Sequence, residues 1–262
     1  MESKGKGSGY TLDYAGLEEL FNLLSQDYIL VAPRLEDGYI KYGKAHSLKD
    51  LPFGFKTYEL AGFYRIEDGV GYFTYPRPIN SLKDFLHPPK LLMLTVRKKE
   101  QGLEFEANIP TKRLCFFDVR ACDLSALKVL DRVFWEKNNH PDPYYLSLRE
   151  DLFIVAVSCL SFTQTCFCKT MGTGPAHKEG YDLLITELDG LFLLEVGSYK
   201  GYEVVKKLRF KREAEPEVFE RKEEILKALE ERMDEVFQRK DLQQQLYANM
   251  DEENWLYIEK RC

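Results

Sequence analysis

The first part of the chain alternates short apolar and polar stretches. Apolar residues at helical spacing predict a helix over Tyr14–Gln26. The apolar run after it, Tyr28–Val31, reads as a strand that ends at Pro33. Residues 38–80 are rich in Gly, Tyr and Phe in short alternating pieces such as Gly71–Tyr75, which indicates β-structure with frequent turns. A short helical turn and another strand are predicted next, at Leu82–Leu86 and Leu91–Val96.

The second part has longer apolar runs. Leu114–Val119 and Leu152–Val157 are almost wholly apolar and predict two buried strands. Between them, Asp123 is a suitable N-cap for a helix that runs from Leu124 to about Trp135.

Two more strands and a helix complete the pattern. Tyr181–Thr186 and Leu191–Val196 flank Asp189-Gly190, a strong hairpin signal. Pro216 is a good first residue for the long amphipathic helix that follows, whose apolar positions continue to Val236 and Phe237. The order strand, helix, strand, hairpin, helix predicts an α/β unit over roughly residues 110–212.

We therefore predict a mixed fold, α/β with α+β character. It has a β-rich N-terminal part, a central α/β part and a long C-terminal helix. The expected division is a mobile leader at residues 1–10, a turn-rich α/β region at 11–110, a central α/β region at 111–212 and a helical segment at 213–262.

Composition narrows the class of protein. Apolar residues make up 44% and charged residues 31% of the 262 positions, which is typical of a globular chain. The net charge of −6, with both signs interspersed, argues against a nucleic-acid binder. The longest apolar run, Leu152–Val157, is too short to cross a membrane, and the first ten residues do not resemble a secretory signal. We expect a cytoplasmic protein that binds neither nucleic acid nor membrane.

The stretch SCLSFTQTCFCKTMGTGP, residues 158–175, holds three of the six cysteines, Cys159, Cys166 and Cys168. In a reducing compartment, clustered cysteines are more often metal ligands or redox groups than disulfides. A bridge between Cys166 and Cys168 would be strained, because only one residue separates them.

A fourth thiol belongs with these three if the two buried strands are parallel neighbours. Cys122 follows strand 114–119 and Cys159 follows strand 152–157, so both would emerge at the same edge of the sheet. Four thiolates suit an iron–sulfur cluster or a structural zinc ion. The C-x6-C-x-C spacing differs from the usual C-x2-C, so the spacing leaves both open.

Five segments resemble one family. They look very much like the beta subunit of soluble sulfhydrogenase-type nickel–iron hydrogenases and the related A subunit of anaerobic sulfite reductase. The resemblance runs clearly from Leu114 to Gly201 and is looser over AGFYRIEDG, SLKDFLHPP and the terminal NWLYIEKRC. The segments are FFDVRACDLSALKVLDRVF, DPYYLSLREDLFIVAVSC, CFCKTMGTGP, YDLLITELDG and VGSYKG.

The resemblance implies an electron-transfer subunit with a 4Fe-4S cluster. Such a subunit stands between a flavin subunit that handles NAD(P)H and a hydrogenase or sulfite reductase catalytic subunit. Members of the family usually continue into a ferredoxin-like domain with two clusters, and here the chain stops at Cys262, where the first ligand of that domain would lie. We expect one cluster, held by Cys122, Cys159, Cys166 and Cys168, and no catalytic residue in this chain.

Two other functions stay open. The same four cysteines could hold zinc in a structural or interaction subunit without redox activity. A thiol-redox enzyme would need one cysteine of low pKa, and nothing marks out a C-x-x-C pair.

Other residues near the cysteines have simpler interpretations. Cys115 alternates with apolar residues and is expected to be an inert core thiol. Gly172 and Gly174 either form a turn or let the backbone approach the cluster. Arg120 and Lys169 either offset the negative charge of a four-thiolate site or are solvated at the surface.

Overall fold

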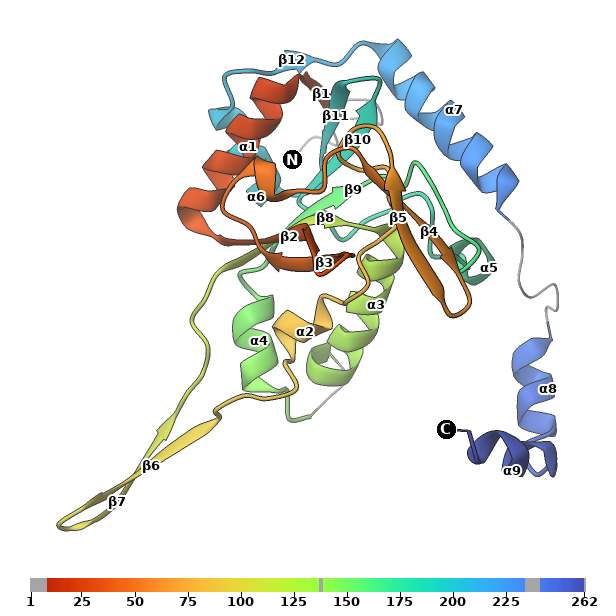
Figure 1. Ribbon diagram of the computed structural model, residues 1–262. Coiled ribbons are helices and arrows are strands. Elements are labelled where there is room, and N and C mark those ends of the chain that lie inside the picture. The colour runs from red at the N-terminus through yellow and green to blue at the C-terminus, as the bar shows by residue number, and fades with distance from the viewer. Residues whose placement is uncertain (1–8, 137–138, 234–240, 262) are drawn as a thin grey trace.

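The centre of the molecule is a mixed β-sheet. The computed structural model describes residues 9–136, 139–233 and 241–261. Within them, an eight-stranded sheet has the order β12-β1-β11-β10-β9-β8-β2-β3 (Figure 1). Its strands are β1 (Gly9–Leu12), β2 (Ile29–Glu36), β3 (Tyr39–Lys44), β8 (Leu114–Val119), β9 (Phe153–Val157), β10 (Leu183–Leu188), β11 (Leu191–Val196) and β12 (Arg212–Glu213).

Helices and two small hairpins surround this sheet, so the fold is mixed α and β, as predicted. The hairpins are β4 (Phe55–Leu60) with β5 (Phe63–Asp68) and β6 (Leu94–Lys99) with β7 (Gly102–Ala107). The helices are α1 (Tyr14–Asp27), α2 (Lys83–Leu86), α3 (Ala121–Asp131), α4 (Pro143–Arg149), α5 (Cys168–Met171), α6 (Tyr199–Lys207), α7 (Pro216–Arg232), α8 (Leu242–Ala248) and α9 (Asn254–Glu259), with short helical turns at Leu48–Asp50 and Arg132–Glu136.

The two strands that precede the predicted site are parallel neighbours. β9 pairs with β8 on one side and with β10 on the other, in both cases parallel. A register shift between Phe117 and Val119 marks a bulge, where Asp118 has a φ of 68°. This bulge lies at the end of β8, immediately before the residues that lead to Cys122.

Each face of the sheet is covered by helices (Figure 1). On one face, α1 buries Leu17, Leu20, Phe21 and Leu24 against β8 and β9, together with Val205 of α6. On the other face, α3 and α4 pack Leu124 and Tyr145 against the opposite side of the same strands. Removing these apolar surfaces from water on both faces is the main stabilisation of the fold.

Several element boundaries differ from the sequence expectations. β2 does not end at Pro33 but continues to Glu36, because beyond Val31 it pairs only with β3 and Pro33 needs no donor toward β8. The strand predicted at Leu91–Val96 begins later and includes Arg97–Lys99, whose charges lie on an exposed hairpin. Gly71–Tyr75 forms bends and no strand.

The helix after β8 begins earlier than predicted. α3 starts at Ala121, with Arg120 as its N-cap residue, so Asp123 lies in the first turn instead of capping it. The side chain of Asp123 accepts a hydrogen bond from Tyr42 at 3.3 Å, which engages one of its carboxylate oxygens away from the helix amides. β10, in contrast, lies two residues later than the predicted Tyr181–Thr186. The hairpin at Asp189-Gly190 is confirmed, with positive φ at both residues.

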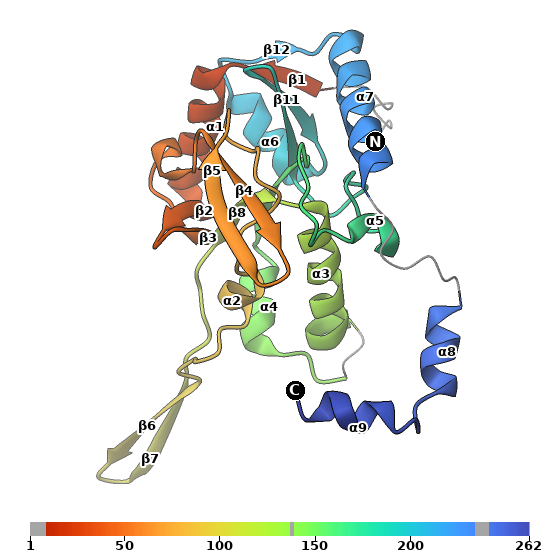
Figure 2. The same cartoon turned by 45° about the vertical axis from the view of Figure 1, so that its right-hand side comes forward.

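Two parts of the chain lie apart from the sheet in both views (Figure 1 and Figure 2). The hairpin β6–β7 projects as an arm, and its Phe105 is 63% exposed. The short helices α8 and α9 form the C-terminal part, while Val236 and Phe237 of the predicted long helix lie outside the described residues.

Candidate functional site

The ends of β8 and β9 bring the first two cysteines together. Cys122 is the second residue of α3, and Cys159 lies two residues beyond the end of β9. Because the register places Val119 opposite Ala156, both chains leave the sheet at the same edge.

The loop after Cys159 presents the other two thiols. The backbone N–H of Thr163 donates to the Cys166 sulfur at 3.4 Å. Cys168 then begins the single turn of α5, which ends at Gly172 in the left-handed conformation. A Cβ atom at Gly174 would stand only 3.0 Å from the Cys168 sulfur, so the backbone there approaches the thiol more closely than a side chain would allow.

The four thiols are near enough to influence one another electrostatically. Burial raises the pKa of Cys159 to about 11, and the neighbouring Cys168 and Cys166 raise it as well. Burial also raises the pKa of Cys122, with further contributions from Asp123, Cys159 and Cys168. Such thiols keep their protons at neutral pH until a bound cation replaces them. The structure therefore brings four thiols from three chain segments into one region at the edge of the sheet.

Tight convergence on a single point is not present. Among the residues that the structure describes, no three His, Cys, Asp or Glu side chains meet closely enough to hold one metal ion. Cys115 is fully buried among core residues of β8, where burial raises the pKa of its thiol, as expected for an inert core cysteine. Cys262 lies outside the described residues.

A buried ion pair lies beneath the thiols. Arg120 and Asp118 have no exposed surface, and the Arg120 Nε lies 2.9 Å from the Asp118 Oδ1. The guanidinium also donates to the carbonyl of Ser158 at 3.3 Å, next to Cys159. The interpretation of Arg120 as a solvated surface residue is therefore wrong: its side chain is completely buried and contacts a carboxylate and backbone carbonyls.

Residues far away in the sequence support the cysteine loop. From the hairpin β4–β5, Glu59 accepts a hydrogen bond from Thr165 at 3.2 Å. Ser161 donates to the carbonyl of Thr74 at 2.5 Å. These contacts could not be predicted, because neither Glu59 nor Thr74 stands in a recognisable motif. The hydroxyl side chains of the loop, such as Ser161 and Thr165, were the sequence feature that pointed to hydrogen bonds there.

The end of α7 also contacts the loop. Lys169 donates from its Nζ to the carbonyl of Met233 at 2.9 Å, and the Arg232 guanidinium lies 5.8 Å from the centre of the Phe162 ring. Lys169 is thus not simply solvated at the surface, because its ammonium group is hydrogen-bonded to the backbone of Met233. It joins the cysteine loop to the C-terminal end of the long helix.

His177 gives the site region a pH dependence. Burial lowers its pKa to about 4, while its Nε2 donates to the carbonyl of Val119 at 3.1 Å and its Nδ1 is buried without a partner. In the unfolded chain His177 is protonated below its ordinary pKa of 6.5, whereas in the folded chain it is protonated only below a pKa of about 4. The free energy of unfolding therefore falls as the pH drops from about 6.5 to about 4. We measure this loss as the difference between the free energies of urea unfolding of the metal-free protein at about pH 7 and about pH 4.5. His177→Gln should make that difference smaller by about 2 kcal/mol. An unchanged pH dependence would contradict this assignment.

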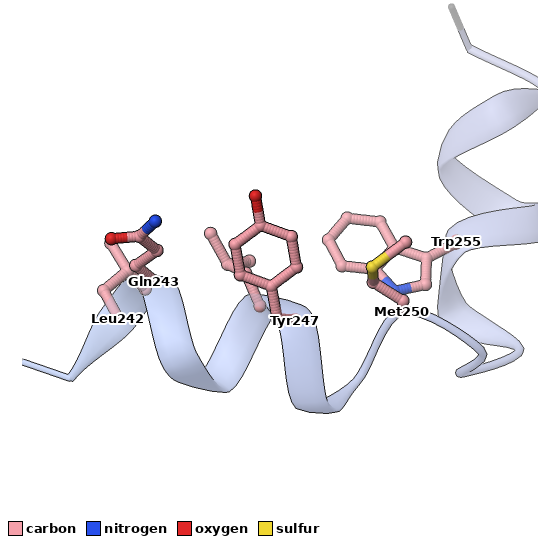
Figure 3. A pocket seen from close by; sticks show the side chains of 6 residues that line it. Leu242, Gln243, Tyr247, Met250 and Trp255 are labelled. Carbon is pink, nitrogen blue, oxygen red and sulfur yellow. The ribbon is translucent and has the colours of Figure 1, made fainter.

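A separate apolar groove lies on the C-terminal helices. It has a volume of about 490 Å³ and is open to solvent (Figure 3). No residue of the predicted site lies in it. The side chains that line it are those of Leu242, Gln243, Leu246, Tyr247, Met250 and Trp255.

Comparison with known proteins agrees with the resemblance read from the sequence. The chain is 37% identical over 131 residues to sulfhydrogenase 2 subunit beta of Pyrococcus furiosus. The match covers 50% of this chain and 37% of that protein, so the chain spans well under two thirds of its relative. The resemblance to beta subunits of sulfhydrogenase-type hydrogenases is thereby confirmed.

Other comparisons add less. No family model matches the chain, and no solved structure matches it. In the described part of the chain, no helix is both long and apolar enough to cross a membrane.

Proposed function

We propose that this chain is an iron–sulfur electron-transfer subunit of a multisubunit hydrogenase or sulfite-reductase-type oxidoreductase. Cys122, Cys159, Cys166 and Cys168 would hold one 4Fe-4S cluster. A bound cluster of this kind accepts and releases single electrons. The partners would be a flavin subunit that handles NAD(P)H and a hydrogenase or sulfite reductase catalytic subunit, in the cytoplasm.

The observation that carries the proposal is the grouping of four thiols at one sheet edge. Burial and mutual repulsion hold protons on the thiols of Cys122 and Cys159, and a cationic group would replace them. Thiolates are the usual ligands of iron–sulfur clusters. The relative is named as a subunit of a sulfhydrogenase, which supports a role within a redox complex.

The surroundings of the thiols fit such a group. The N–H of Thr163 donates to Cys166, and hydrogen bonds to sulfur are one of the ways in which a protein adjusts a cluster's potential. At Gly174 the backbone comes close to Cys168 where a Cβ would crowd the sulfur.

Spectroscopy and metal analysis of the full chain test the proposal. Protein purified without oxygen, or reconstituted with iron and sulfide, should show a broad absorption near ~400 nm that dithionite bleaches. Metal analysis should give about four iron atoms per chain. A colourless protein with one zinc per chain would contradict the proposal and favour a structural zinc site.

A further inference from the structure

Asp118 and Arg120, at the end of β8 and the start of α3, form a buried ion pair whose positive and negative ends have different neighbours. Asp118 occupies the bulge of β8 with a positive φ of 68°, and Arg120 follows two residues later at the start of α3. The positive φ is uncommon for a residue with a side chain, and it turns the Asp118 carboxylate toward Arg120. Both side chains are completely buried.

The two ends of the pair have different neighbours. The Arg120 guanidinium donates to the carbonyl of Ser158 at 3.3 Å and lies 3.5 Å from the carbonyl of Phe73. The Asp118 carboxylate accepts a hydrogen bond of 2.5 Å from the Tyr75 hydroxyl. Tyr75 is also fully buried, and its ring centre lies 5.2 Å from the guanidinium. The positive end therefore faces the segment that carries Cys159.

Stability alone is a weak reason for such a pair. Removing two charges from water costs several kcal/mol per ion, and apolar residues of similar size often stabilise a core as well. The pair also lies next to a segment that carries a thiol. The guanidinium contacts this segment directly through its hydrogen bond to the carbonyl of Ser158 at 3.3 Å, and Cys159 is the next residue.

We propose that the Asp118–Arg120 pair is a positioning device that raises the reduction potential of a cluster held by the four thiols. The inference rests on the proposed function. One-electron reduction makes a four-thiolate site more negative, and a fixed positive end beside Cys159 stabilises the reduced form relative to the oxidised form. Arg120 keeps its charge at all pH values at which the protein is folded. The aspartate holds the guanidinium in place and weakens its field.

Midpoint potentials of the reconstituted full chain provide the test. Potentials are measured by dithionite titration followed by electron paramagnetic resonance, with iron content as a second readout. Arg120→Met should shift the potential to more negative values, and Asp118→Asn should shift it to more positive values. Arg209→Met is the matched control, because Arg209 is 80% exposed and pairs with Glu19 instead.

Opposite shifts in the two variants support the proposal, since a merely structural role would not reverse sign. Unchanged potentials at normal iron content, or shifts in the same direction, would overturn it. If Arg120→Met does not bind iron, the midpoint potentials of Arg120→Lys and Asp118→Asn test the proposal instead. The potential of the lysine variant should stay close to that of the original protein, and the potential of the asparagine variant should be more positive. Absence of iron from the unmodified chain would instead refute the proposed function.

Discussion

Replacing Cys122 by serine is expected to abolish or severely reduce iron incorporation. Serine keeps the size of the side chain but removes the soft sulfur ligand that iron–sulfur clusters require. Cys122 stands at the start of α3, where its thiol interacts with those of Cys159 and Cys168. A loss to below about a tenth of the original iron per chain is expected, measured after anaerobic reconstitution.

Cys115→Ser is the matched control, because it makes the same atomic change on β8, the strand that precedes α3. The Cys115 side chain is fully buried in the apolar core and takes no part in the thiol group. Its replacement should cost some stability, about 1–3 kcal/mol for a buried hydroxyl, yet leave iron content nearly unchanged. Iron loss in the Cys115 variant with retention in the Cys122 variant would show that the ligand set is wrong.

Phe117→Ala is expected to destabilise the fold by about 3–5 kcal/mol, the largest change from a single core truncation proposed here. Phe117 is fully buried at the centre of β8, with its ring 5.4 Å from that of Phe21 and 6.5 Å from that of Phe73. The truncation leaves a cavity between α1, the sheet and the bends that contain Phe73. The midpoint of urea unfolding should fall with little change in slope.

Phe105→Ala makes the same change on the projecting arm. Because Phe105 is 63% exposed on a hairpin apart from the sheet, its loss should change the free energy of unfolding by no more than about 0.5 kcal/mol. Equal destabilisation by the two alanine variants would mean that the arm packs against the core in solution. The comparison thus separates core energetics from surface hydrophobicity.

The two buried strands at the centre of the sheet could be predicted from the sequence, whereas their parallel pairing was a condition that the structure meets. Two nearly continuous apolar runs, Leu114–Val119 and Leu152–Val157, had the composition of strands covered on both faces, and both faces are covered. From this pairing, the closeness of Cys122 and Cys159 could be predicted, because chains that leave parallel neighbours emerge at one edge.

Other features depend on tertiary context and could not be predicted. The bulge at Asp118 and the burial of Arg120 arise from packing around the end of β8. From the sequence, charged residues are ordinarily expected at the surface. The helix α4 has no expected counterpart in the sequence pattern, although Pro143 is its first residue and Asp142 caps it through the N–H groups of Tyr144 and Tyr145. Likewise, the bond from Thr165 to Glu59 joins segments about a hundred positions apart.

The contact between Lys169 and Met233 fixes the point from which the C-terminal helices start. From Met233 to Asp241 the chain makes eight steps, so a fully extended backbone reaches about 30 Å. Because the groove lies beyond Asp241, on α8 and at the start of α9, a macromolecule bound in it would be held within a few tens of ångströms of the cysteine loop. Its local concentration there would be of millimolar order, and encounters with the loop would become intramolecular events that no longer depend on dilution.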